Sequence, residues 1–223
     1  MSVAEASGLR ARLGGSLLAR GGGALVVQLL DASVLHAFDR EAQMCRTDVQ
    51  SHRVEQHDGE EDRGGAPDRW LESAPGGPEL RALYASAGVA ELLTSLTAIR
   101  WTPSGGAGTY SYYCRAGHYL GLHRDVVECD LALIVCISDS GAASPREAGT
   151  LCIYPGRAAE PLSRIRAEPA RGSVEVRLRP GEAALLLGGI VPHRVSPTAP
   201  GQLRVVAPLC FSPVERVEAV KLP

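Results

Sequence analysis

Residues 110–137 read YSYYCRAGHYLGLHRDVVECDLALIVCI, in which two β-rich stretches flank the polar motif His123-Arg124-Asp125. Aromatic and β-branched residues of this kind are those that pleated, half-buried strands favour. Similar short runs occur before and after this stretch, and Gly and Pro clusters such as Pro180–Gly181 separate many of them. This succession predicts a β-sandwich, a barrel or a jelly roll. The runs that we expect to form strands are residues 98–101, 110–114, 127–137, 150–154, 174–178, 183–187 and 203–210.

The first half of the chain has a different pattern. Ala24–Leu30 is a compact apolar run that predicts a strand. Asp31 is a candidate N-cap for a helix that extends to about Arg46, and helical periodicity resumes at Pro78–Leu96. Thr47–Asp68 lies between these helices and is strongly polar, which indicates a loop.

Size and composition indicate one globular domain. A chain of 223 residues can bury a proper core, and 45% hydrophobic with 22% charged residues is an ordinary globular balance. We therefore expect a single domain over residues 1–223. A mostly helical part, residues 1–97, would supply buttressing helices for a β core over residues 98–213. In fold class, this is a mainly β protein with flanking helices (α+β).

Charge and hydropathy exclude several partners. The net charge is −2 and no basic face stands out, so we expect no nucleic-acid partner. No apolar run approaches the roughly 18 residues that a bilayer span needs, and the N-terminus lacks the apolar centre of a signal peptide. We expect a cytoplasmic protein without membrane association, and the sequence leaves the oligomeric state open.

The six cysteines are scattered and include no CxxC pair. Five of them lie in apolar, strand-like contexts, where a free cysteine behaves as a small hydrophobic residue. A reducing compartment disfavours disulfides, and the absence of paired short spacings disfavours a zinc site. We therefore expect no disulfide among Cys45, Cys114, Cys129, Cys136, Cys152 and Cys210.

His123 and Asp125 are the strongest candidates for a metal site. Residues two apart in an extended chain project to the same face, so both can point inward while Arg124 points away. His193 follows a second apolar run, Ala183–Val191, on a separate strand or strand end. Each of these residues alone is more often structural. Together, two imidazoles and one carboxylate make the 2-His-1-carboxylate facial triad, which leaves coordination positions open for a chelating substrate and dioxygen.

Arg204 strengthens this hypothesis. It comes eleven positions after His193, on the following predicted strand, between Leu203 and Val205-Val206. The plain alternative is a surface charge on an edge strand, but the apolar surroundings make idle exposure less expected. A guanidinium in this place can clamp the distal carboxylate of an iron-chelating 2-oxo acid through two parallel hydrogen bonds.

In ordered combination, these motifs resemble the Fe(II)/2-oxoglutarate dioxygenases, and among them the prolyl-hydroxylase-like group. The matching stretches are CRAGHYLGLHRD at 114–125, EAGTL at 147–151, RPGEAALLL at 179–187 and HRVSPTAPGQLR at 193–204. The resemblance covers about residues 98–213 and rests on the order of the motifs, because each piece alone is weak. It implies a double-stranded β-helix, the jelly roll of that family.

The resemblance also implies a site and a reaction. His123, Asp125 and His193 would be the Fe(II) ligands, and Arg204 would anchor 2-oxoglutarate. The implied enzyme is an oxidoreductase that uses O2 and hydroxylates an unactivated C–H bond of a small molecule, such as an amino acid or a specialised metabolite. Decarboxylation of 2-oxoglutarate to succinate and CO2 would be coupled to it. Asp125 separates this chain from the halogenases, where Gly or Ala at this position leaves room for halide.

Two positions depart from the family pattern. Family members often carry a Tyr nine residues before the first His ligand, where it helps to bind the cosubstrate, and this chain has Cys114 there. Tyr112 would share the strand face of Cys114, and Tyr113 is adjacent. The position two after the anchoring Arg is often Ser and is Val206 here. Cys114 and Tyr112 are therefore our candidates for cosubstrate binding beside Arg204.

Other residues are candidates for the pocket mouth. We consider Trp101, Tyr110 and Tyr119 as substrate-binding residues, although an aromatic residue in a strand is more often simply packed. Thr47–Asp68 and Pro155–Gly172 are the two loops that we consider as a lid over the pocket.

Three other functions fit parts of the pattern. A peptidyl (prolyl-type) hydroxylase would use the same residues, because the resemblance does not fix the substrate. A cupin-like metal protein without redox chemistry would need the three ligands but not Arg204. A partner-binding protein with a degenerate site would fail to bind Fe(II). Formation of succinate from 2-oxoglutarate separates the oxygenases from the last two.

Overall fold

The computed structural model describes residues 8–9, 11–55, 67–140 and 148–215. Its helices are α2 (Leu17–Arg20), α3 (Ala32–Cys45), α4 (Pro78–Tyr84), α5 (Ala87–Thr97) and α6 (Leu162–Ala167), with 3-10 turns η1 (Arg46–Asp48) and η3 (Pro155–Arg157). Its strands are β1 (Ala24–Gln28), β2 (Gln50–Val54), β3 (Arg69–Pro75), β4 (Trp101–Pro103), β5 (Thr109–Tyr113), β6 (Tyr119–His123), β7 (Leu131–Asp139), β8 (Leu151–Ile153), β9 (Val174–Val176), β10 (Glu182–Leu186), β11 (His193–Val195) and β12 (Arg204–Pro213).

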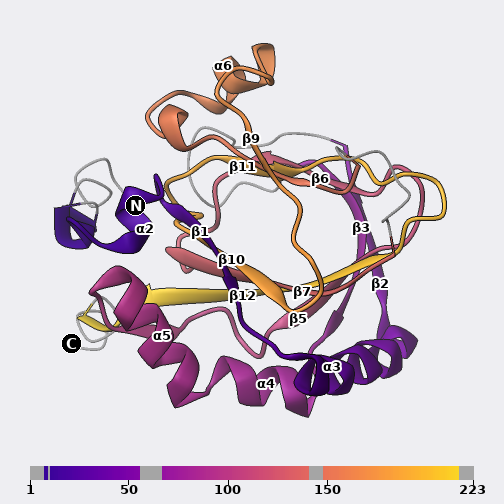
Figure 1. Ribbon diagram of the computed structural model, residues 1–223. Helices are drawn as coiled ribbons and strands as arrows, with labels where there is room; N and C mark the ends of the chain where they lie inside the picture. Colours follow the sequence, from indigo (N-terminus) through magenta and orange to yellow (C-terminus); the bar gives the residue numbers. More distant parts are fainter. Residues whose placement is uncertain (1–7, 10, 56–66, 141–147, 216–223) are drawn as a thin grey trace, which may run out of the picture.

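The strands form one sheet that curls on itself into two facing layers (Figure 1). The larger layer holds β1, β10, β7, β12 and β5, and the smaller layer holds β6, β11, β8 and β9. Strand β3 pairs with both β5 and β6 and so joins the two layers. The result is the jelly roll that the sequence predicts, with flanking helices.

The helices cover the outer faces of both layers. In Figure 1, α3, α4 and α5 lie along the outside of the larger layer, and α6 lies outside the smaller layer. Asp31 caps α3, because its carboxylate accepts the backbone N–H groups of Ser33 and Val34 at 2.9 and 3.0 Å. The buried side of α3 presents Phe38 and Ala42 to the sheet. Among the described helices, none is long and apolar enough to cross a membrane.

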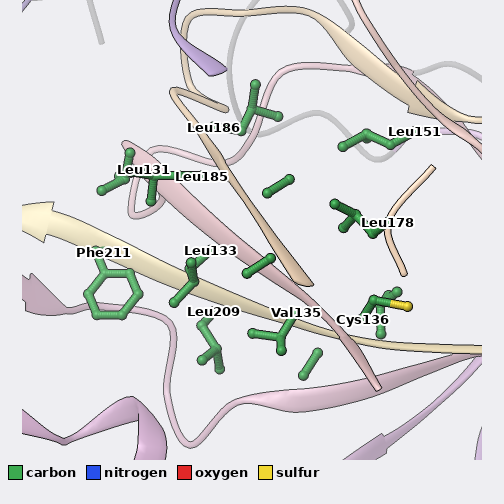
Figure 2. Packing of buried hydrophobic residues seen from close by; sticks show 14 of the residues in the cluster. Leu131, Leu133, Val135, Cys136, Leu151, Leu178, Leu185, Leu186, Leu209 and Phe211 are labelled. Atoms are coloured by element: carbon green, nitrogen blue, oxygen red, sulfur yellow. The ribbon is translucent and has the colours of Figure 1, made fainter. Parts of the chain in front are cut away.

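Alternate residues of the larger layer pack against these helices. Leu133 of β7 is the Cα partner of both Leu185 of β10 and Leu209 of β12, so the three side chains share one face (Figure 2). Phe211 continues this face and meets the ring of Tyr84 edge to face, with ring centroids 5.1 Å apart. The residues that alternate with them project into the space between the layers.

The observed strands agree with those predicted from the sequence except in one region. Every run that we expected to form a strand overlaps an observed strand. The loop predicted at Thr47–Asp68 is wrong for residues 50–54, which form β2 and pair with β3; residues 56–66 lie outside the described residues. Strand β3 escaped prediction because its inward side chains, such as Arg69 and Ser73, are polar and break the apolar alternation. The described part of the first 97 residues therefore contributes strands β1, β2 and β3 to the sheet as well as helices.

The cysteines give a second correction. Cys129, just before β7, forms a disulfide with Cys210 of β12, so the expectation of no disulfide is wrong for this pair. The two cysteines are 81 positions apart in sequence, and their proximity follows from the antiparallel pairing of β7 with β12. The other four cysteines are free thiols. The cytoplasmic location stays a prediction.

A buried carboxylate joins α3, α4 and the sheet. Glu41 is 3% exposed and accepts the N–H groups of Glu79 and Leu80 at 2.6 and 3.0 Å. These amides belong to the first turn of α4. The N–H groups of a first turn have no acceptor within their own helix. Glu41 also accepts the hydroxyl of Tyr110 at 2.7 Å. Burial, together with this hydrogen bond, raises the pKa of Tyr110, so the phenol stays a donor.

Replacement of Glu41 by Gln tests this junction. One acceptor oxygen becomes an amide donor that faces other donors, so we expect the free energy of unfolding to fall by roughly 1–3 kcal/mol. Urea denaturation measures the change. Glu91→Gln, at an exposed position of α5, is the matched control and should change stability by less than about 0.5 kcal/mol. Equal stability of Glu41→Gln and the wild type would contradict this account.

Candidate metal centre and anion site

The two histidines of the predicted triad face each other across paired strands. His123 ends β6 and His193 begins β11, and the two are Cα partners. Their ring centroids are 4.2 Å apart. Asp125 Oδ1 lies 3.4 Å from His123 Nε2 and 3.6 Å from His193 Nε2. One ligand atom from each residue therefore falls within 4.8 Å of the others, a spacing that one metal ion can bridge.

Backbone carbonyls fix the orientation of both imidazoles. His123 Nδ1 lies 2.9 Å from the carbonyl oxygen of Gly121, and His193 Nδ1 lies 3.0 Å from that of Val191. A carbonyl can only accept, so in the neutral rings each Nδ1 carries the proton and each Nε2 is left as the acceptor. The Nε2 atoms are those that point to Asp125. A hydrogen bond from Nδ1–H to a carbonyl group is a usual way in which a protein fixes the tautomer of a histidine that binds metal through Nε2.

Gly188 makes room for the carboxylate. The N–H of Asp125 donates to the carbonyl of Gly188 at 2.9 Å, and a Cβ at Gly188 would collide with Asp125 Oδ2. Any side chain at this position would displace the ligand, so glycine is required for the close approach. Gly188 could not be predicted as part of the site, because nothing in the sequence shows which segment lies against Asp125.

The electrostatics of the triad suit metal ligands. Burial disfavours ionisation of Asp125, but His193 and His123 outweigh it and hold the pKa of Asp125 well below its usual range. Burial, reinforced by His193, lowers the pKa of His123. Burial opposes protonation of His193, but Asp125 outweighs it and raises the pKa of His193. The ionised carboxylate and the neutral His123 are thus in the forms that bind a divalent cation, whereas His193 would release its proton when the ion binds.

Arg204 lies on the inner face of the larger layer. It is the Cα partner of Tyr113, and its guanidinium carbon is 5.6 Å from the centroid of the Tyr113 ring. Arg204 is 2% exposed, and its Nε and Nη1 atoms have no hydrogen-bond partner among the described residues. A buried guanidinium without an acceptor is strongly unfavourable. The arrangement therefore fits an anion such as a carboxylate, whose two oxygens can accept from two N–H groups along one edge of a guanidinium.

Tyr113, rather than Tyr112 or Cys114, accompanies Arg204. Burial raises the pKa of Tyr113 to about 12, so its hydroxyl stays protonated and can donate. Tyr112 projects to the opposite face of β5, where its hydroxyl donates to the carbonyl of Ala42 in α3 at 2.7 Å. The thiol of Cys114 donates to Glu72 at 3.1 Å. The structure does not bring Tyr112 or Cys114 to the guanidinium of Arg204.

The three aromatic candidates for the pocket mouth also lie elsewhere. Tyr110 is held by Glu41 on the helix side of the sheet. Trp101 donates to Thr97 of α5 at 2.7 Å and is buried beside that helix. Tyr119 is the Cα partner of Trp70 on the outer face of β3.

A bulge in β6 explains why Tyr119 and His123 face opposite ways. His193 pairs with His123, and Val195 pairs with Leu120, so two residues of β6, Gly121 and Leu122, oppose the single residue Arg194 of β11. The extra residue reverses the alternation. Leu120 therefore shares the inner face with His123, and Tyr119 does not.

Arg124, between the candidate ligands His123 and Asp125, binds three carbonyl groups. Its Nε donates to Ile190 at 3.3 Å, and its Nη2 donates to Ala158 and Glu160 at 3.0 and 2.8 Å. Ile190 lies three residues before His193, and the other two belong to the segment between β8 and β9. The guanidinium thus links the strand end that carries His123 and Asp125 to the loop that leads to His193.

The candidate lid Pro155–Gly172 is tied down from within. Arg157 is 3% exposed, donates to three carbonyl oxygens of this segment and pairs with Glu160 at 2.8 Å. Leu162 and Ile165 of α6 form a small apolar cluster with Leu122 of β6 and Tyr154. Because Leu122 points away from the interior, the segment is an outer cover of the smaller layer rather than a flap over the site.

Three solved structures illustrate the resemblance of this fold to known proteins. The non-haem α-ketoglutarate-dependent epimerase SnoN of nogalamycin biosynthesis matches with a TM-score of 0.65 at 18% identity, over 95% of this chain and 84% of that chain. A Pseudomonas putida prolyl-4-hydroxylase matches with a TM-score of 0.57 at 15% identity, over 92% and 98%. HygX from Streptomyces hygroscopicus, with nickel, 2-oxoglutarate and hygromycin B bound, matches with a TM-score of 0.57 at 16% identity, over 86% and 83%.

These matches establish the class of fold. The chain has the double-stranded β-helix of the 2-oxoglutarate–Fe(II) oxygenases, which confirms the fold-level resemblance predicted from the sequence. No family model and no curated protein matches the chain. At identities of 15 to 18%, the likeness speaks for the fold, and the activity has to be argued from the site.

Replacement of Arg124 tests the link between the ligands and the outer segment. Arg124→Met keeps the apolar stem but removes the donors to the three carbonyls, so we expect Co(II) affinity to fall by at least about tenfold in a folded protein. Competition with a chelating dye measures the dissociation constant, and circular dichroism checks the fold. Arg164→Met, on the exposed side of the same segment, should bind Co(II) as the wild type does. Equal affinities of Arg124→Met and the wild type would sink the idea.

Proposed function

We propose that this protein is an Fe(II)/2-oxoglutarate-dependent dioxygenase that hydroxylates an unactivated C–H bond of a small molecule. The observation that carries the proposal is the combination of two elements on the inner face of the jelly roll. One is the triad of His123, Asp125 and His193, and the other is the buried Arg204 without an acceptor. A metal site alone would fit many chemistries, but the arginine selects an acidic cosubstrate.

Each residue has a separate part in the proposal. His123, Asp125 and His193 would hold Fe(II) and leave three coordination positions for the 2-oxo acid and O2. Arg204 would bind the distal carboxylate of 2-oxoglutarate, and the Tyr113 hydroxyl would donate to the same molecule. When bound, iron supplies the activation of O2 that couples loss of CO2 from 2-oxoglutarate to oxidation of the substrate.

The protein would provide a dry and fixed site for this chemistry. Ile153 and Val195 are buried and share the inner face of the smaller layer with His193, because Ile153 is the Cα partner of His193 and Val195 follows it by two. Apolar walls exclude water, which strengthens the ion pairs within the site and limits side reactions.

A small-molecule substrate is the form of the proposal that we favour. SnoN has been solved with α-ketoglutarate and nogalamycin RO, and HygX with hygromycin B. A related Trichoplax adhaerens prolyl hydroxylase has been solved with a peptide fragment, so the fold also serves peptides. A peptide substrate is therefore one of the outcomes that a substrate search has to separate.

Anaerobic titration of the metal-free protein with Fe(II) and then 2-oxoglutarate tests the proposal. We expect the visible charge-transfer band of a bidentate 2-oxo acid on iron. His193→Ala should abolish the band. Arg204→Ala should weaken 2-oxoglutarate binding by at least about tenfold, because a charge-assisted hydrogen bond is lost. Arg53→Ala, which removes an exposed arginine of β2, is the matched control and should titrate as the wild type does.

The opposite outcome is equally informative. A folded protein that binds iron but shows no band with 2-oxoglutarate would rule out the 2-oxoglutarate chemistry. The site would then be that of a cupin-like metal protein without redox function. Succinate formed under air, in proportion to 2-oxoglutarate consumed, would support the oxygenase independently of the band.

A further inference from the structure

A second arginine, Arg69 of β3, faces the interior of the jelly roll. Directly opposed residues of an antiparallel pair project to the same face. Arg69 is the Cα partner of Leu120, which is also the Cα partner of Val195. Val195 lies two residues after the metal-ligand candidate His193 and so shares its face. The strand pairings of the smaller layer therefore place Arg69 on the face that carries the triad.

The larger layer gives the same orientation independently. Ser111 of β5 is the Cα partner of Val206, two residues from Arg204, and also of Ser73 in β3. Ser73 is four residues after Arg69, so the two side chains share one face of β3. Both routes through the hydrogen-bonded ladders thus place Arg69 and Arg204 on the inner face.

Arg69 has no partner there. Its Nε atom is buried and makes no hydrogen bond to any residue that the structure describes. Neighbouring arginines on the outer face are paired. Arg115 lies 3.1 Å from Glu72, and Arg53 lies 2.8 Å from Glu55. Arg69 is thus the arginine of this region that lacks a carboxylate within the described residues.

The adjacent carboxylate does not serve Arg69. Asp68 is turned toward β6, where its carbonyl oxygen accepts the N–H of Gly121 at 2.7 Å. Its side chain is hydrogen bonded to Tyr119, and this bond, after burial and the charge of Asp68, contributes to the raised pKa of Tyr119. Arg69 is half-buried, and its buried Nε has no acceptor among the described residues, so an anion that binds on this face would satisfy a donor that these residues leave open.

The cosubstrate of the proposed function cannot supply this anion. 2-Oxoglutarate has two carboxylates: one chelates the metal together with the 2-oxo group, and the other meets Arg204. None is left for Arg69. Arg69 lies opposite Leu120, which is three residues from His123 in β6. Three residues correspond to about 10 Å along a strand. An arginine side chain and a small substrate together span that length.

We propose that Arg69 binds a carboxylate of the primary substrate, so that the substrate is a small carboxylic acid. One guanidinium balances one negative charge, which suits a carboxylate better than a phosphate dianion, and its fork matches the two carboxylate oxygens. The inference rests on the proposed 2-oxoglutarate chemistry and names the class of molecule that this chemistry would oxidise. It makes Arg69 a substrate-binding residue and Arg204 the cosubstrate anchor.

Matched acids and amides test the proposal in the protein loaded with Fe(II) and 2-oxoglutarate under anaerobic conditions. The probes are the L-amino acids and simple monocarboxylic acids of two to eight carbons, each beside its primary amide. The perturbation of the charge-transfer band gives the affinity. We expect at least one acid to bind about tenfold or more tightly than its amide, because the amide lacks the charge that Arg69 pairs with.

Variants assign this preference to Arg69. In Arg69→Gln, we expect the acid and the amide to bind within about twofold of each other, and Arg69→Lys should restore part of the preference. Arg53→Gln, one strand away and on the outer face, should behave as the wild type does. The affinity for 2-oxoglutarate should stay within about twofold of the wild type in all three. The comparison of acids with amides in the wild type stands even if an Arg69 variant fails to fold.

Several outcomes would overturn the proposal. Equal binding of acids and amides, binding of no acid in the panel, or an undiminished preference in Arg69→Gln would each show that Arg69 does not read a carboxylate. Loss of 2-oxoglutarate binding in Arg69→Gln would assign Arg69 to the cosubstrate instead. Absence of the band in the wild type would be the failure of the proposed function itself, and it is seen before any probe is added.

Discussion

The antiparallel pairing of β6 with β11 is the interaction on which the candidate site depends. It sets His123 directly opposite His193, and the bulge in β6 keeps both rings turned to the interior. Asp125 then reaches both Nε2 atoms from just beyond the end of β6. The imidazole rings of His123 and His193 contact backbone carbonyl groups of residues close to them in the chain. The sheet itself therefore holds the three side chains in place before any ligand binds.

The outer surroundings of the smaller layer reinforce this geometry. The side chain of Arg124 points outward and donates to the carbonyls of Ile190, Ala158 and Glu160. The segment that supplies two of these carbonyls is organised around the buried Arg157. The interior, by contrast, holds two arginines, Arg69 and Arg204, with buried donors that lack an acceptor among the residues that the structure describes. Paired arginines thus serve the scaffold, and the two arginines with unpaired donors are the ones that we propose to bind anions.

The sequence predicted the fold class and most strands because short β-branched and aromatic runs with Gly and Pro between them have few other solutions. It did less well where a strand carries polar residues inward, as β3 does, or where a polar stretch such as residues 50–54 pairs at an edge. The choice between Tyr112 and Tyr113 failed for a related reason. Adjacent residues of a strand face opposite sides, and only the register with β12 shows that Tyr113 is the one beside Arg204.

The sequence by itself determined the residue types and their order: two histidines, one aspartate and a following arginine on β-rich segments, which together define the candidate chemistry. Only the tertiary structure decided which faces these segments share. Three features depend on positions that are far apart in the chain. They are the inward direction of Arg69, the close approach of Gly188 to Asp125 and the disulfide between Cys129 and Cys210. Such contacts depend on strand register and sheet curvature, and local sequence patterns carry no record of either.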